Sequence, residues 1–246
     1  MTDAQPPLLL LLHGLGANRE VWRGLTERLP GHWPGDWLAP DLPGHGNAEP
    51  LRRYSFGAMA AALAEDLPPE RRVIALGHSL GGVLALALAS GWFGVRVDAV
   101  CGLGIKVRWT QEELDKAAQV ATRPGRVFGT RDEAARRWLR GAGLTGLLPA
   151  DSPAVAAGVR RIGGDEDGWR LTVDQGAFGV GAPNMPGLLA ACRADPVLAA
   201  GEHDPMCPAA HLWDLRADHV ELPGLGHNAH VEDPAALLPL LDRISG

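Results

Sequence analysis

The chain has 246 residues, enough for one large α/β domain or for a core domain that carries an inserted subdomain. It has 23 Lys and Arg against 29 Asp and Glu and no basic block, so neither nucleic acid nor an anionic membrane is favoured as a partner. No run of about 20 apolar residues predicts a transmembrane helix. Three widely spaced cysteines, Cys101, Cys192 and Cys207, are typical of reduced thiols in a cytoplasmic protein.

The first predicted strand covers residues 8–12, which are all leucine. A continuously apolar run is typical of a strand buried in a parallel sheet. The acidic segment before it lacks a basic region, and the run is too short for the apolar part of a signal peptide, so secretion is not expected. The strand ends at a glycine-rich turn, His-Gly-Leu-Gly-Ala-Asn, at residues 13–18.

Helices and strands alternate from there to residue 104. Apolar residues at helical spacing predict two helices, over 20–29 and 56–67. Apolar runs predict three strands, over 37–40, 72–76 and 95–104. A tight Asp-Leu-Pro-Gly-His-Gly turn at 41–46 contains His45, for which we expect a structural role.

A short turn, Gly-His-Ser-Leu-Gly-Gly at 77–82, connects the strand over 72–76 to an apolar helix-forming run. The serine at such a turn has a strained backbone, and small residues must flank it so that strand and helix can pass closely. The turn lifts the hydroxyl of Ser79 above the carboxyl end of the sheet and points the amide of Leu80 toward the same space. One turn therefore supplies both a nucleophile and an anion-stabilising donor.

This turn resembles the nucleophile elbow, G-x-S-x-G, of the α/β-hydrolase family, and the resemblance extends over nearly the whole chain. It implies a mostly or wholly parallel sheet with helices on both faces and an inserted helical lid. In the family, an H-G-x turn after the first strand supplies the second amide of the oxyanion hole, which the resemblance assigns to Leu15. Members usually begin with an antiparallel hairpin, which we expect to be missing because only seven residues precede Leu8.

The alternating pattern stops between residues 106 and 186, which resemble the lid of this family. We expect a core of 1–105 and 187–246 with a lid of 106–186. Thr110 and Thr130 each stand three residues before a glutamate, which predicts a capping box at the start of a helix.

Large apolar side chains of the lid are expected to pack within it or to line the substrate pocket: Trp109, Phe128, Trp138, Trp169, Phe178 and Met185. Four lid arginines, Arg131, Arg136, Arg137 and Arg140, allow two readings, recognition of an anionic substrate or a solvated helix face. We favour the solvated face because Asp132 and Glu133 lie beside them.

The core pattern returns with strands over 196–201 and 219–222 and a final amphipathic helix from Asp233. The family pattern G-x-x-D matches residues 201–204, which favours Asp204 over Glu202 as the catalytic acid. The loop at 224–227, Gly-Leu-Gly-His, resembles the family's catalytic histidine loop, with His230 as the nearest rival to His227. Three other histidines near the site are assigned no proton transfer: His13, His78 and His203.

A serine hydroxyl is a weak nucleophile unless a base takes its proton, and a buried carboxylate orients that base. Ser79, Asp204 and His227 follow the family's chain order. They predict a serine hydrolase that cleaves a carboxylic ester of a small to medium substrate through an acyl-enzyme intermediate. Two alternatives stay open: a cofactor-free lyase or carbon–carbon bond hydrolase, and a non-catalytic ligand receptor.

Neither a metal nor a cofactor is expected. A cluster of possible ligands, His203, Asp204, Cys207 and His211, matches neither the H-E-x-x-H motif nor paired C-x-x-C motifs. Gly14 and Gly16 follow a strand, but Arg19 replaces the last glycine of a dinucleotide-binding motif. The expected partner is a small-molecule substrate, and its identity and the oligomeric state are left open.

Overall fold

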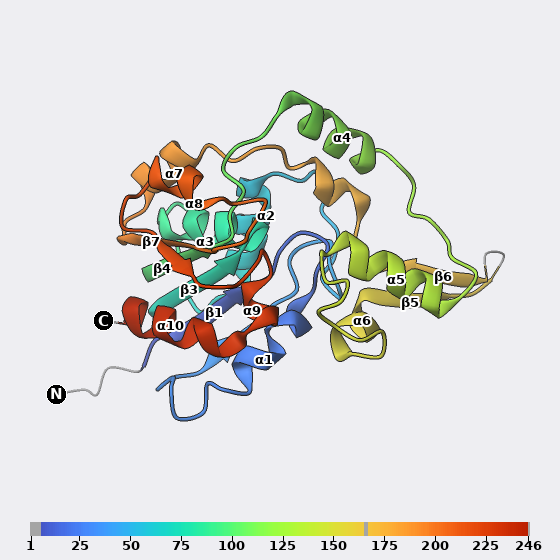
Figure 1. The fold of residues 1–246 in the computed structure, drawn as a ribbon. Coiled ribbons are helices and arrows are strands. Elements are labelled where there is room, and N and C mark those ends of the chain that lie inside the picture. Colours follow the sequence, from blue (N-terminus) through green and yellow to red (C-terminus); the bar gives the residue numbers. More distant parts are fainter. Residues whose placement is uncertain (1–5, 165–166, 246) are drawn as a thin grey trace.

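The computed structural model describes residues 6–164 and 167–245, and a six-stranded sheet is its central feature (Figure 1). The strands are β1 (Leu8–Leu12), β2 (Trp37–Leu38), β3 (Val73–His78), β4 (Val97–Leu103), β7 (Pro196–Gly201) and β8 (Val220–Leu222). Their order is β2-β1-β3-β4-β7-β8, and all the pairings are parallel. The predicted α/β fold is confirmed. The expected loss of the N-terminal hairpin falls largely on residues 1–5, outside the described residues.

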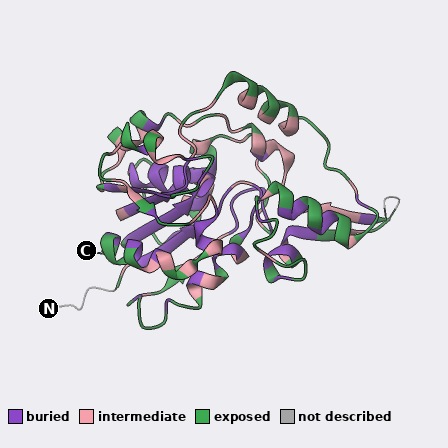
Figure 2. Cartoon of the chain, in the orientation of Figure 1, coloured by how far each residue is buried: buried purple, intermediate pink, exposed green. Residues whose placement is uncertain are grey.

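Helices cover both faces of this sheet (Figure 1). One face packs against α2 (Phe56–Glu65), α3 (Leu80–Ala89), α7 (Met185–Ala191) and α8 (Ala209–Trp213). The other packs against η1 (Arg19–Trp22), α1 (Arg23–Thr26), α9 (Ala229–Glu232), η3 (Pro234–Leu237) and α10 (Leu238–Ser245). Leucines of β1 alternate between the two faces, and every residue of α3 is buried (Figure 2). Burial on both sides explains why β1 is continuously apolar.

The single helix predicted over 20–29 is instead the short 3₁₀ helix η1 followed by α1. Gly24 lies where the chain passes Pro234 closely, since a Cβ at Gly24 would be 2.6 Å from the Cγ of Pro234. Across residues 6–164 and 167–245, no helix has the length and apolar character needed to cross a membrane.

Residues 106–186, the range for which the sequence predicts a helical lid, lie between β4 and β7, and we keep the name lid for this segment. It contains α4 (Gln111–Ala121), α5 (Arg131–Gly141), α6 (Pro153–Gly158), β5 (Val159–Ile162), β6 (Gly168–Leu171) and η2 (Gln175–Gly179). Thr110 and Thr130 cap α4 and α5 as predicted, and Thr110 forms the complete capping box. The antiparallel pair β5–β6 was not predicted. The last two residues of the range already belong to α7, which packs against α3 of the core.

Candidate active site

Ser79 stands at the turn between β3 and α3, with φ +50° and ψ −116°. It is the one described residue other than glycine with a positive φ. Such strain costs about 1–3 kcal/mol and persists where the surroundings impose it. A Cβ at Gly77 would lie 2.2 Å from the carbonyl oxygen of Gly81, and one at Gly81 would lie 2.2 Å from that of Leu12. These glycines therefore allow the close approach that holds Ser79 at the tip of the turn.

Asp204 and His227 meet beyond the carboxyl ends of β7 and β8. Nδ1 of His227 donates to Oδ2 of Asp204 at 2.8 Å. The carboxylate is fully buried, and its Oδ1 accepts the amides of Met206 at 2.8 Å and Cys207 at 3.0 Å. Because Nδ1 carries the proton, Nε2 of a neutral His227 ring is an acceptor.

The rival acid and the rival histidine are placed differently. Glu202 is exposed and accepts the amide of Gly224 at 2.8 Å. His203 is also exposed. His230 is buried against Trp22, with ring centroids 4.7 Å apart, and burial lowers its pKa to about 3. None of these three lines the cavity next to Ser79.

That cavity lies between the core and the lid, has a volume of about 390 Å³, and is lined by both Ser79 and His227. Most of its wall is apolar: Leu15, Phe56, Val83, Ile105, Trp109, Leu114, Phe178, Val180 and Met206. Among the lid aromatics singled out above, Trp109 and Phe178 thus face the cavity, whereas Phe128 and Trp138 are buried in the hydrophobic core. An apolar wall with few polar groups is typical of a site for a small organic substrate.

Some basic residues of the lid face only solvent, and others also line the cavity. Arg136 and Arg137 are exposed, as expected for a solvated helix face. Arg140 is exposed too, but it also lines the cavity. Lys106 is a further cavity-lining cation; it pairs with Glu113 and lies 4.7 Å from the centre of the Trp109 ring.

Both residues expected to supply the oxyanion hole line the cavity, Leu15 and Leu80. Leu80 is the first residue of α3, so its amide has no carbonyl partner within the helix. The turn that carries Leu15 is fixed by His13, whose Nε2 accepts the amide of Leu42 at 2.9 Å while Nδ1 donates to the carbonyl of Gly14 at 2.8 Å. Burial, with a smaller effect of His45, lowers the pKa of His13 to about 3, so the ring stays neutral.

His45 has the structural role expected of it. It is fully buried, its Nδ1 donates to the carbonyl of Pro43 at 3.1 Å, and its ring lies 5.3 Å from that of His13. Cys207 is buried beside Asp204, and burial and the carboxylate raise its pKa to about 12. It is therefore a protonated thiol at neutral pH and no rival to Ser79 as a nucleophile. The described residues contain no group of three or more metal-ligating side chains placed to hold a metal ion.

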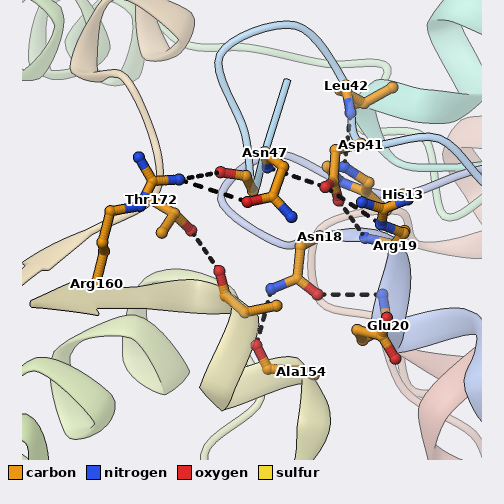
Figure 3. Close-up of polar contacts among 12 residues, drawn as sticks. His13, Asn18, Arg19, Glu20, Asp41, Leu42, Asn47, Ala154, Arg160 and Thr172 are labelled. Atoms are coloured by element: carbon orange, nitrogen blue, oxygen red, sulfur yellow. Dashed lines mark hydrogen bonds and ion pairs between the residues drawn. The ribbon is translucent and has the colours of Figure 1, made fainter. Parts of the chain in front are cut away.

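The turn at residues 13–18, which carries Leu15, is joined to the lid by a side-chain hydrogen bond (Figure 3). Asn18 is fully buried; its Nδ2 donates to the carbonyl of Ala154 at 2.8 Å, and its Oδ1 accepts the amide of Glu20 at 3.1 Å. Nearby, Arg160 of the lid donates to the carbonyl of Gly46 at 3.2 Å. The bond of Asn18 joins the lid to the turn that carries Leu15, and the bond of Arg160 joins it to the neighbouring turn at 41–46.

Asn18→Asp is expected to lower the free energy of unfolding by about 1–3 kcal/mol, because a carboxylate keeps the acceptor but puts negative charge against the carbonyl of Ala154. Asn47→Asp is the matched control, since Asn47 is exposed and only its Oδ1 receives a side-chain bond. It should change the free energy by less than about 0.5 kcal/mol. Urea unfolding measures both variants, and equal losses would show that the Asn18 bond adds no stability.

The loop of His227 is held from its own C-terminal side by Glu232. Oε2 of Glu232 accepts the amide of Gly226 at 2.6 Å, and Oε1 accepts that of Asn228 at 3.0 Å. The side chain of Asn228 donates to the carbonyl of Gly143 in the lid at 3.0 Å. The residues on either side of His227 are thus both fixed.

Glu232→Gln should lower the free energy of unfolding by about 1–3 kcal/mol, because its amide nitrogen would face a backbone N–H in place of an acceptor oxygen. Glu221→Gln, at an exposed position of β8, is the control and should leave stability unchanged. Chemical unfolding at neutral pH compares them. Unchanged stability in Glu232→Gln would show that Glu232 does not stabilise the loop of His227.

A strained serine at the end of a strand, a buried Asp–His pair and a long insertion between two strands of a parallel sheet are features of one class of fold. A family profile described as "Alpha/beta hydrolase family" matches residues 9–240. The chain belongs to the alpha/beta hydrolase family.

Among curated proteins, the chain is 36% identical over 119 residues to a pimeloyl-[acyl-carrier protein] methyl ester esterase of Neisseria meningitidis serogroup B, over 48% of this chain and 44% of that enzyme. It is 43% identical over 88 residues to a protein of the same name from Aeromonas salmonicida, over 35% of this chain and 33% of that protein. The chain therefore spans less than half the length of these relatives.

Solved structures match over almost the whole chain. A thioesterase domain from the curacin biosynthetic pathway has a TM-score of 0.76 at 20% identity, over 98% of this chain and 92% of that one. An E-2-(acetamidomethylene)succinate hydrolase has a TM-score of 0.77 at 23% identity, over 97% and 91%. At these identities the likeness establishes the fold.

Proposed function

We propose that this protein is a serine hydrolase that cleaves a carboxylic ester of a small to medium substrate through an acyl-enzyme intermediate. The observation that carries the proposal is the 2.8 Å bond between His227 and the buried Asp204, next to the cavity that both His227 and the strained Ser79 line. The names of the curated relatives, which are esterases, support the same reaction class.

In the proposed reaction, Oγ of Ser79 attacks the ester carbonyl while Nε2 of His227 takes its proton. The amides of Leu15 and Leu80 stabilise the negative charge that develops on the carbonyl oxygen. His227 returns the proton to the departing alcohol, which leaves an acyl group on Ser79. Water, deprotonated by His227, then releases the acid and restores the serine. Asp204 holds the Nδ1–H tautomer of His227 and stabilises the imidazolium.

Asp204→Asn is expected to lower kcat by about 10⁴-fold, because an amide no longer fixes the tautomer or stabilises the imidazolium. Glu202→Gln is the matched control and should keep wild-type kcat within about twofold, since Glu202 is exposed and bonds only a loop amide. Initial rates with an activated ester measure both. A large loss in Glu202→Gln with a small one in Asp204→Asn would transfer the role of the acid to Glu202.

The apolar wall of the cavity favours a substrate with an apolar acyl group. Residues 106–186 are proposed to act as a lid over the core that selects this group. The names of the relatives make methyl esters the first substrates to test. The experiment compares methyl and 4-nitrophenyl esters from acetate to palmitate with the matching amides.

Hydrolysis of short and medium esters, with much slower cleavage of palmitate and amides, is the expected result. Tight binding of one ligand without any turnover would support a receptor. Turnover retained in Ser79→Ala would support a lyase.

A further inference from the structure

His78, the residue before the nucleophile, is a buried histidine to which the proposed mechanism gives no part. It ends β3, is 3% exposed, and touches the cavity wall beside Ser79. Its side chain extends from the elbow to the loop of His227, which lies 149 residues further along the chain.

The contact between these two histidines is a hydrogen bond from ring to backbone. Nε2 of His78 lies 2.9 Å from the carbonyl oxygen of His227. A carbonyl oxygen only accepts, so Nε2 of His78 carries the proton. The two rings also pack together, with centroids 4.7 Å apart.

This bond completes the restraint of His227. Asp204 holds its ring at Nδ1, and Glu232 holds the amides before and after it. The carbonyl is held by His78, and His78 is covalently joined to Ser79. Among these contacts, the bond from His78 connects the base to the nucleophile without passing through the acid.

We propose that His78 is a positioning residue, whose bond from Nε2 to the carbonyl of His227 sets the base loop against the elbow so that His227 meets Ser79. The inference rests on the proposed function, in which His227 is the base and Ser79 the nucleophile. It assigns His78 no proton transfer.

The surroundings of His78 keep this donor in place. The titratable groups that face it are His230, with a ring centroid 4.3 Å away, His227 and His13. Burial, then the charges that these histidines would carry, lower the pKa of His78 well below 6.5. A neutral His78 also adds no second positive charge beside the imidazolium that forms on His227.

The test compares His78→Gln, whose amide nitrogen can replace Nε2 as a donor, with His78→Leu, which has no donor. For a 4-nitrophenyl ester, His78→Leu should lower kcat by about 10- to 100-fold with KM within about twofold, because a small displacement of the base costs that much. His78→Gln should recover most of the loss. Equal losses in both variants, or none in either, would overturn the proposal.

Two further measurements test the protonation of His78 and distinguish a failure of this proposal from a failure of the proposed function. If His78→Leu does not fold, His78→Met, which also lacks a donor, replaces it in the comparison. Independently, ring ¹⁵N shifts of the wild type should show His78 neutral and protonated at Nε2 from about pH 5.5 to 8. A proton on Nδ1 would contradict the proposal. Ser79→Ala and His227→Ala are assayed alongside: their activity would refute the proposed function, whereas inactive Ser79→Ala and His227→Ala with fully active His78→Leu would refute only the role of His78.

Discussion

Ser79→Ala is expected to lower kcat for ester hydrolysis by about 10⁴- to 10⁶-fold, because no acyl-enzyme can form without the hydroxyl. The fold should survive, since alanine is smaller and the close approaches at the elbow are made by Gly77 and Gly81. Stability should rise slightly or stay the same. A loss of activity with an intact fold would show that the hydroxyl of Ser79 is needed for catalysis and not for folding.

Ser90→Ala is the control for this variant. Ser90 is the buried residue at the other end of α3, where its hydroxyl donates to the carbonyl of Ala87 at 2.6 Å. Its removal should cost about 1 kcal/mol of stability and leave kcat unchanged. Equal activity of Ser79→Ala and Ser90→Ala in an ester assay would exclude Ser79 as the nucleophile.

Acid is expected to unfold this protein because of its buried neutral histidines. Burial lowers the pKa of His13 and His230 from 6.5 to about 3, that of His45 to about 4, and that of His78 well below 6.5. Well above pH 6.5 these rings are neutral in both states, so stability is fully present there. As the pH falls, the unfolded chain binds protons that the folded chain excludes, and stability is lost progressively toward the folded pKa values.

One proton that the folded state excludes changes stability by at most about 1.4 kcal/mol per pH unit, so a group of such histidines should make stability fall steeply below pH 6.5. Urea unfolding at several pH values between 7.5 and 4.5 measures this slope. His230→Leu should make this slope shallower, because one of the excluded protons is removed. His203→Gln, at an exposed position, should leave it unchanged. A wild-type stability that does not vary over this range would contradict the neutral histidine cluster.

Features that depend on local sequence were predictable. The leucines of β1 are buried on both sides, so their uninterrupted run indicates a parallel strand. The elbow was predictable because a strand, a serine flanked by glycines and a helix follow one another in the sequence, and Gly77 and Gly81 are needed where strand and helix pass closely. Thr110 and Thr130 marked their helix starts through a contact between residues three apart.

Features that depend on contacts between distant segments were not predictable. The pair β5–β6 contains Arg160 and Arg161, which are exposed and break the apolar pattern that marks a strand. His78 and Glu232 carried only weak signals, the first as the variable residue of the elbow and the second as an acid five residues after His227. Their partners become clear only when the loops are placed together.

Whether Ser79 is the nucleophile is tested by labelling the protein with a fluorophosphonate and locating the adduct by peptide mass spectrometry. One adduct is expected, on Ser79, formed in step with the loss of esterase activity and much more slowly in Asp204→Asn. An active esterase that carries the adduct on another residue, or that keeps its activity after Ser79 is fully labelled, would contradict this role of Ser79.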